Sequence, residues 1–335
     1  MRAIITQGLY QPLKMATLPD PTPQAGEVVV KVGRCGICGS DLHMTHDPAY
    51  GMKPGDVLGH EFAGEVVALG PGVDGVSTGD LVAVIPLHGC GACEPCRAGE
   101  YAWCDRFGLQ GGGYAEYALT TPAQCVVLPR SASLADGAII EPLAVALHGV
   151  TLSELKAGDK ILVLGAGPIG LAVAFWARQR GAARVVVQDI ANWQQDRALA
   201  MGADGFVADS ADPLGAAERT LGGKADIVFE CVGVPGLIQQ AVAQVRNRGT
   251  ILLLGLCTQP DTINSFAMLQ KEVRLITSAF FTLADYQAAL DALSAGAAEP
   301  RLMVTDTIPL SATPDRFEAL RQRTHDCKVL IDPAA

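Results

Sequence analysis

Residues 159–170 read D-K-I-L-V-L-G-A-G-P-I-G. An apolar strand pattern runs directly into three glycines spaced as G-x-G-x-x-G, and an apolar helical pattern follows. In that context the first glycine makes a tight turn, the second lets a pyrophosphate approach, and the third lets the helix pack on the strand. The stretch therefore predicts a dinucleotide-binding parallel sheet, with contacts at Gly165, Gly167, Pro168, Ile169 and Gly170.

Asp189 ends the next apolar strand pattern, 24 residues after Gly165. A carboxylate at this place can accept hydrogen bonds from the ribose hydroxyls of NAD, and it repels the 2′-phosphate of NADP. No arginine follows it directly to compensate that charge. We therefore predict NAD as the cofactor. The alternative for Asp189 is an ordinary helix N-cap, and one residue can do both.

On either side of this stretch, the chain shows two different secondary-structure patterns. From about residue 144 to 281, helix and strand patterns alternate, which predicts an α/β domain with a parallel sheet covered on both faces. Residues 1–143 instead hold short β-rich runs separated by Gly and Pro, which predict a small barrel or sandwich. Residues 282–335 begin with an amphipathic helix pattern and end in a helix and a strand.

Composition excludes several classes of protein. The 335 residues carry a net charge of −10, with 25 Lys and Arg against 35 Asp and Glu, which argues against a nucleic-acid partner. No apolar run reaches membrane-spanning length, and the N-terminus lacks a secretory signal pattern. We therefore expect a cytoplasmic protein without a membrane partner. Ten cysteines in a chain of this length favour metal binding or catalysis over a disulfide framework.

Four of these cysteines lie within residues 90–104 with the spacing C-x2-C-x2-C-x7-C. Four thiolates in a short loop make a closed tetrahedral set, which is typical of structural zinc and leaves no corner for a substrate. A thioredoxin-like redox pair would need a C-x-x-C motif in a βαβ context, which is absent here. The predicted structural zinc ligands are Cys90, Cys93, Cys96 and Cys104.

A second metal site is suggested by residues 35–43, which read C-G-I-C-G-S-D-L-H. A catalytic zinc ion needs about three protein ligands and one open position. Cys38 offers a thiolate, His60 an imidazole, and Glu61 or Glu141 a carboxylate. Each of these residues alone has an ordinary explanation as a core or surface side chain, so the hypothesis rests on the set.

These motifs occur together in the order found in the zinc-containing medium-chain alcohol dehydrogenases, and the chain resembles that family over essentially its whole length. Besides the stretches above, G-H-E-F-A-G-E-V at 59–66 carries the resemblance, and E-P-L-A-V-A-L-H at 141–148 is similar to the sorbitol (polyol) dehydrogenase branch. The resemblance implies a GroES-like catalytic domain, residues 1–143 with 282–335, and a Rossmann domain, residues 144–281. It also implies a homodimer or homotetramer that pairs through the edge strand of the Rossmann sheet.

By the same resemblance, Cys38 and His60 bind a catalytic zinc ion, with Glu61 and Glu141 as alternative further ligands. The chain would then hold two zinc ions, one catalytic and one structural. Ser40 is placed to take the proton of an alcohol substrate, and His43 is suited to carry that proton to solvent. Asp41 is expected to orient His60.

The resemblance also implies further cofactor contacts at Val232, Leu254, Gly255, Ala279, Phe281 and Lys328. For Lys328 the alternative is an ordinary surface lysine. Substrate contacts are expected at Ser40, Tyr50, Leu109 and Phe280. Sorbitol-type enzymes carry an Arg-Tyr pair where an ungapped placement puts Phe280 and Phe281, which favours a less hydroxylated secondary alcohol or diol over a long sugar alcohol.

The predicted activity is hydride transfer between a small secondary alcohol, diol or polyol and NAD, giving a ketone or aldehyde. One alternative is a metal-free medium-chain reductase of the same superfamily, although those chains lack both cysteine sets. Another is a zinc-ribbon interaction module without catalysis, which failure to bind NAD would favour. A zinc hydrolase would not need the glycine motif followed by Asp189.

Overall fold

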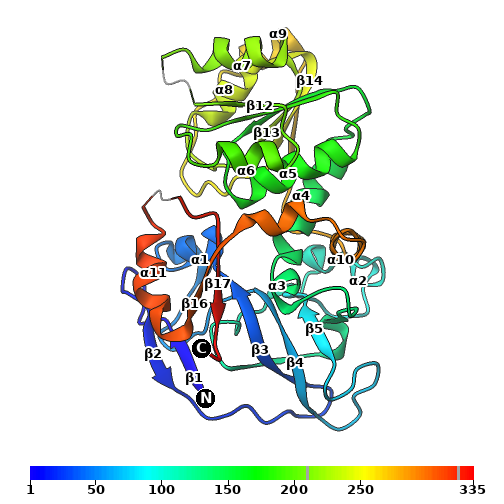
Figure 1. The fold of residues 1–335 in the computed structure, drawn as a ribbon, viewed down its shortest axis with the longest axis vertical. Coiled ribbons are helices and arrows are strands. Elements are labelled where there is room, and N and C mark those ends of the chain that lie inside the picture. The colour runs from blue at the N-terminus through cyan, green and yellow to red at the C-terminus, as the bar shows by residue number, and fades with distance from the viewer. Residues whose placement is uncertain (209–210, 323–324) are drawn as a thin grey trace. The chain divides into compact units, whose positions relative to one another are not determined.

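A computed structural model describes residues 1–208, 211–322 and 325–335. The chain forms two compact units (Figure 1). The first comprises residues 1–141 and 282–335, and the second comprises residues 142–281. Among the described residues, no helix is both long and apolar enough to cross a membrane.

The second unit is built on a parallel sheet that has six strands within the described residues, in the order β12-β11-β10-β13-β14-β15. The central β10 lies between β11 and β13, so the chain winds outward from it in both directions, as in a Rossmann sheet. The ends of β10 and β13 therefore meet at the point where the winding reverses. The strands are β10 (Lys160–Leu164), β11 (Arg184–Gln188), β12 (Gly205–Val207), β13 (Ala225–Glu230), β14 (Val245–Leu253) and β15 (Arg274–Thr277).

Helices cover both faces of this sheet (Figure 1). On one face, α7, α8 and α9 pack into an apolar cluster with Leu162, Val186 and Val228. On the other face lie α4, α5 and α6, and α5 contacts β10 and β11. Burial on both faces explains why these strands are almost continuously apolar. The helices are α4 (Ile140–Leu152), α5 (Pro168–Gln179), α6 (Gln195–Ala200), α7 (Pro213–Leu221), α8 (Leu237–Gln244) and α9 (Ser265–Lys271).

The first unit is β-rich. Its main sheet, as far as the structure describes it, follows the order β16-β17-β3-β4-β5-β9, with β8 paired to β3. Strands β1-β2 and β6-β7 form two further two-stranded sheets. The strands are β1 (Arg2–Ile5), β2 (Lys14–Thr17), β3 (Val28–Gly36), β4 (Glu61–Leu69), β5 (Leu81–Val84), β6 (Leu87–His88), β7 (Gly108–Leu109), β8 (Tyr117–Thr120), β9 (Cys125–Val127), β16 (Val304–Pro309) and β17 (Lys328–Asp332).

The C-terminal segment completes this sheet. Strand β17 pairs antiparallel with β3, with Leu330 opposite Gly36 and Ile331 opposite Cys35. Phe317 of α11 joins the same buried cluster as Phe62. The remaining helices of the unit are α1 (Gly39–Met44), α2 (Glu94–Arg97), α3 (Leu134–Gly137), α10 (Leu283–Ser294) and α11 (Thr313–Ala319), with 3-10 helices η1 (Pro48–Tyr50), η2 (Tyr101–Trp103), η3 (Pro122–Gln124), η4 (Glu299–Met303) and η5 (Leu310–Ala312).

Candidate metal centres and cofactor loop

Cys38, His60 and Glu61 form one cluster in the first unit, with their possible ligand atoms within 4.8 Å of one another. Strand pairing creates this cluster. Gly36, at the end of β3, lies opposite Glu61, at the start of β4. Cys38 follows β3 by two residues and His60 immediately precedes β4, so both lie at the same edge of the sheet. A thiol, an imidazole and a carboxylate at this separation suit a zinc ion.

The Ser40 hydroxyl contacts two members of this cluster, and His43 is exposed on the same helix, α1. The Ser40 hydroxyl donates to Cys38 Sγ at 3.1 Å, and its Oγ lies 3.4 Å from His60 Nε2. His43 is three residues further along α1 and is exposed. Helix α1 therefore carries one hydroxyl to the possible ligands and one imidazole to solvent.

Asp41 lies fully buried against His60, with its Oδ1 at 3.2 Å from His60 Nδ1. Its other oxygen, Oδ2, accepts hydrogen bonds from the Cys38 N–H at 3.1 Å and the Tyr114 hydroxyl at 2.6 Å. Burial lowers the pKa of His60, but the Asp41 and Cys38 charges outweigh it and raise this pKa well above its usual value. A metal ligand must be a neutral imidazole, so binding a metal through Nε2 would release this proton.

Glu61 is already held by a cation. Lys328 Nζ donates to Glu61 Oε2 at 2.6 Å, to Oε1 at 2.7 Å and to the Ile37 carbonyl at 3.1 Å. Lys328 is only 1% exposed, so it is not a surface lysine. An ammonium group has three donors, and these contacts use all three. In this arrangement the Lys328 ammonium group is directed at Glu61 and Ile37, and the cofactor contact that the family resemblance implies for Lys328 stays a prediction.

Glu141 lies close to this cluster but outside the group of three. It is buried in the first turn of α4. Burial raises the pKa of Glu141 to about 7; the His60 charge opposes this rise and the Glu61 charge adds to it. The structure therefore brings Cys38, His60 and Glu61 together and places Glu141 within their electrostatic reach.

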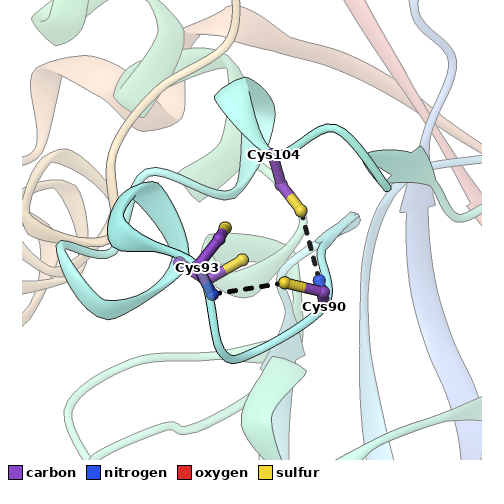
Figure 2. Close-up of side chains that lie close together, drawn as sticks. Cys90, Cys93 and Cys104 are labelled. Atoms are coloured by element: carbon purple, nitrogen blue, oxygen red, sulfur yellow. Dashed lines mark hydrogen bonds between the residues drawn. The ribbon is translucent and has the colours of Figure 1, made fainter.

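The four clustered cysteines form the other group of possible ligands, with Cys90, Cys93, Cys96 and Cys104 within 4.8 Å of one another. Backbone N–H groups point at their sulfurs: Cys90 donates to Cys104 Sγ and Cys93 to Cys90 Sγ, each at 3.3 Å (Figure 2). These backbone hydrogen bonds, chiefly from Ala92 and Cys93, lower the pKa of Cys90 to about 6. Backbone hydrogen bonds from Cys90 and Arg106 likewise lower the pKa of Cys104. For Cys93 the backbone hydrogen bond from Cys96 lowers the pKa, but side-chain hydrogen bonding with Cys96 and burial outweigh it and raise the pKa to about 12. The loop thus favours the thiolate, which is the form that binds zinc, at Cys90 and Cys104.

The glycine loop of the second unit has the geometry that a pyrophosphate needs. Gly165 lies in the left-handed region, with φ of 98°, and a Cβ on Gly170 would lie 1.9 Å from the Gly165 carbonyl oxygen. A Cβ on Gly167 would meet nothing within 4 Å, so this side of the loop is open. Pro168 and Ile169 begin α5 there. Asp189 is half-buried, and its Oδ2 accepts from the Ala166 N–H at 2.8 Å.

Glu230 organises the neighbouring loops, a role that the sequence did not indicate. Its buried carboxylate Oε1 accepts from the N–H groups of Val232 at 2.7 Å and Gly233 at 2.9 Å. Its backbone carbonyl accepts from Leu254 at 2.8 Å and Gly255 at 2.9 Å. One residue thus ties together the ends of β13 and β14, where several cofactor contacts are predicted.

The other predicted contacts lie in different surroundings. Ala279 is exposed, the side chain of Phe281 is buried, and Phe280 is half-buried with a φ of 57°. Tyr50 is half-buried, and burial together with the charges of Asp47 and Cys38 raises its pKa. Leu109 packs against the apolar cluster of the first unit. Of these residues, Tyr50 is the one that the structure links to the Cys38 site.

Two family models match the chain: the alcohol dehydrogenase GroES-like domain at residues 24–130 and the zinc-binding dehydrogenase at residues 168–295. A sorbitol dehydrogenase of Bacillus subtilis (strain 168) is 31% identical over 334 residues, covering 96% of this chain and 94% of that protein.

Solved structures agree with this relationship. The alcohol dehydrogenase rspB of E. coli CFT073, complexed with NADH, has a TM-score of 0.90 at 30% identity and 99% coverage of both chains. The 2R,3R-butanediol dehydrogenase of Bacillus subtilis has a TM-score of 0.88 at 29% identity, again with 99% coverage of both chains. With its GroES-like and Rossmann domains, the chain belongs to the zinc-containing medium-chain alcohol dehydrogenase family, in its sorbitol dehydrogenase-like branch.

Proposed function

We propose that this protein is an oxidoreductase that uses zinc to transfer hydride between NAD and a secondary alcohol, diol or polyol, giving a ketone or aldehyde. The observation that carries the proposal is the cluster of Cys38, His60 and Glu61 within 4.8 Å, with the Ser40 hydroxyl among them. The same chain carries a dinucleotide loop of suitable geometry. Relatives named as sorbitol and butanediol dehydrogenases support this reaction class.

Two zinc ions per chain fit the side chains present. Cys38 and His60, with Glu61 or Glu141, would hold the catalytic ion, and the four clustered cysteines would hold the structural ion. When bound, the catalytic zinc supplies a Lewis acid for the alcohol oxygen and NAD supplies the hydride acceptor. The other steps belong to side chains of the protein.

Ser40 and His43 are proposed to move the alcohol proton. The Ser40 hydroxyl lies among the possible zinc ligands, where it can accept a proton from a bound alcohol. His43 follows at i+3 on α1, the spacing at which helical side chains are neighbours, and it is exposed. An imidazole titrates near neutral pH and suits transfer to solvent.

The cofactor is proposed to be NAD. The open side of the loop at Gly167 leaves room for a pyrophosphate, and the N-terminus of α5 favours its negative charge. Asp189 follows β11 at the place where a carboxylate accepts from ribose hydroxyls and repels a 2′-phosphate. Among the solved relatives, the rspB structure holds NADH and a zinc-binding dehydrogenase of Sinorhizobium meliloti 1021 is bound to NADP, so the choice of NAD rests on Asp189.

The substrate is proposed to be a small secondary alcohol or vicinal diol, and Ser40 and Tyr50 are proposed to contact it. An ungapped placement puts Phe280 where the sorbitol-type enzymes carry the arginine of their Arg-Tyr pair. With that placement, Phe280 offers no hydrogen-bond donor to the further hydroxyls of a sugar alcohol. Leu109 is proposed as a further apolar contact. A butanediol dehydrogenase among the relatives is consistent with such a preference.

We further propose a homodimer or homotetramer that forms through β15, and a cytoplasmic location. Strand β15 is the last strand of the Rossmann sheet as described, and Arg274, Leu275 and Thr277 on it are exposed. Exposed edge strands pair readily with another chain. All ten cysteines, each in a described part of the chain, are free thiols, which suits a reducing compartment.

The test is to supply zinc-replete protein with NAD or NADP and a panel of vicinal diols, polyols, simple secondary alcohols and aromatic alcohols. NADH formation is followed by absorbance, with and without a chelator, and the Cys38→Ser variant serves as a matched control. Chelator-sensitive turnover that is absent from Cys38→Ser supports the proposal. If none of the alcohols gives NADH and the protein does not bind NADH, the dehydrogenase function is contradicted.

A further inference from the structure

Tyr114 is a fully buried tyrosine whose hydroxyl contacts Asp41, the carboxylate next to the metal-ligand residue His60. It is 0% exposed, and its hydroxyl donates to Asp41 Oδ2 at 2.6 Å. Burial, together with the negative charge of Asp41, raises the pKa of Tyr114 well above its usual value, so the hydroxyl keeps its proton and remains a donor.

The Tyr114 ring is held on two sides. A Cβ on Gly59, the residue before His60, would lie 2.4 Å from the Tyr114 ring, so the backbone of this turn passes directly against it. On another side, the ring meets Phe317 edge to face, with centroids 6.5 Å apart. The hydroxyl therefore cannot move away from Asp41 without disturbing packed neighbours.

Asp41 contacts both Cys38 and His60, the thiol and imidazole ligands of the proposed metal site. Its Oδ2 accepts from the Cys38 backbone N–H at 3.1 Å, which holds the turn that carries the thiol. Its Oδ1 is buried and forms no hydrogen bond with the described residues, and His60 Nδ1 at 3.2 Å is the adjacent group that can supply one. A buried carboxylate oxygen without a donor is costly, so the direction of Oδ1 sets the direction of the His60 ring.

We propose that Tyr114 is a positioning residue for the catalytic metal site: by donating to Asp41 Oδ2, it turns Oδ1 toward His60 Nδ1 and leaves Nε2 free for the metal. This inference rests on the proposed function, because it assumes that Cys38 and His60 hold a metal ion. Asp41 is the partner one step beyond the ligand His60, and the loss of such a partner typically costs about 10- to 100-fold in metal affinity. Tyr114 acts through Asp41, one step further out, so its effect should lie at the lower end of this range.

The experiment measures zinc bound per chain after dialysis at graded free zinc concentrations, so activity is not the readout. In the wild type we expect two steps. The step that disappears in Cys38→Ser belongs to the catalytic site, and the remaining step belongs to the four cysteines. In Tyr114→Phe, the catalytic step should move to a free zinc concentration about tenfold higher.

Three controls accompany Tyr114→Phe. The four-cysteine step should stay in place, which shows that the variant is folded. Tyr117→Phe removes a hydroxyl from a half-buried tyrosine three residues along the chain and should leave both steps unchanged. In an Asp41→Asn background, the further change Tyr114→Phe should have little effect, because the proposed influence of Tyr114 passes through Asp41.

The possible failures are distinguishable. If the catalytic step in Tyr114→Phe coincides with that of the wild type, Tyr114 is not a positioning residue, and the proposed function stands. If the wild type shows one step that Cys38→Ser retains, neither the metal site nor this inference holds. An equal shift of both steps in Tyr114→Phe would mean a general loss of structure and would overturn the specific role.

Discussion

Lys328 and Glu61 form an ion pair in which each residue is only 1% exposed, with Nζ at 2.6 and 2.7 Å from the two carboxylate oxygens. The two residues are 267 positions apart in the chain. Lys328 begins β17 and Glu61 begins β4, so the pair joins the returning C-terminal segment to the strand that carries the candidate metal ligands.

Removing the cation of this pair should destabilise the protein strongly. Lys328→Met leaves the Glu61 carboxylate buried without its partner, and we expect the free energy of unfolding to fall by about 3–5 kcal/mol. Urea unfolding followed by circular dichroism measures this change. Lys328→Arg keeps the charge and should lose much less. A Lys328→Met variant as stable as the wild type would show that Glu61 finds another partner.

The glycine loop predicts different outcomes for two neighbouring glycines. Gly170→Ala places a Cβ against the Gly165 carbonyl oxygen, so we expect a loss of stability of about 1–3 kcal/mol together with weaker NADH binding. Gly167→Ala has open space and a φ of −72°, so it should fold normally while its methyl group obstructs the pyrophosphate. Thermal unfolding and NADH fluorescence titration distinguish the two. Normal NADH affinity in Gly167→Ala would place the pyrophosphate elsewhere.

Glu230 should affect cofactor binding through the loops that it holds. Glu230→Ala removes the acceptor for the Val232 and Gly233 N–H groups, and we expect the dissociation constant for NADH to rise about tenfold, or about 1.4 kcal/mol. Glu230→Gln retains a carbonyl oxygen that can accept both bonds and should bind NADH nearly as the wild type does. Isothermal titration calorimetry measures both. Equal losses in the two variants would show that the charge of Glu230 matters rather than its position.

The Asp136–Arg301 pair should make stability depend on pH. Burial raises the pKa of Asp136, but hydrogen bonds from Arg301 and Ser133 outweigh it, and the pKa is lowered from 3.8. The folded state therefore binds this proton more weakly than the unfolded state, and the contribution is present above pH 3.8 and disappears as the pH falls below it.

The matching variant is Asp136→Asn. At pH 7 we expect it to be less stable than the wild type by about 1–3 kcal/mol, because Arg301 and Ser133 lose a charged acceptor. The difference should shrink as the pH falls below about 4. Urea unfolding at several pH values measures both chains. A difference that stays constant with pH would contradict the ionised pair.

Ser40→Ala should separate proton transfer from metal binding. The variant removes the hydroxyl that lies 3.1 Å from Cys38 Sγ, while Cys38, His60 and Glu61 remain. Turnover should fall by about 10²- to 10⁴-fold, with zinc content unchanged. His43→Asn should show a smaller loss, since an exposed imidazole is more easily replaced by buffer. Unchanged turnover in Ser40→Ala would exclude the hydroxyl from proton transfer.

The motifs that could be predicted from the sequence are those whose residues lie only a few positions apart in the chain. Three such motifs are the glycine motif, the four-cysteine loop and the pair His60-Glu61. Each is defined by residue types at short spacing, so it can be recognised directly in the sequence. Short elements within the Rossmann unit were less visible: β12, α7 and α9 were not singled out, because they span three, nine and seven residues in polar surroundings. Their place was decided by packing on the sheet.

The sequence by itself determined the family, the two kinds of domain and the side chains available for zinc and NAD, because those depend on residue type and short spacing. Only the tertiary structure decided that Lys328 neutralises Glu61, that Tyr114 reaches Asp41 across 73 positions of chain, and that Glu230 ties two loops together. These are buried polar contacts between distant segments. Burial removes water from such groups, so each needs a protein partner, and the fold determines which partner is within reach.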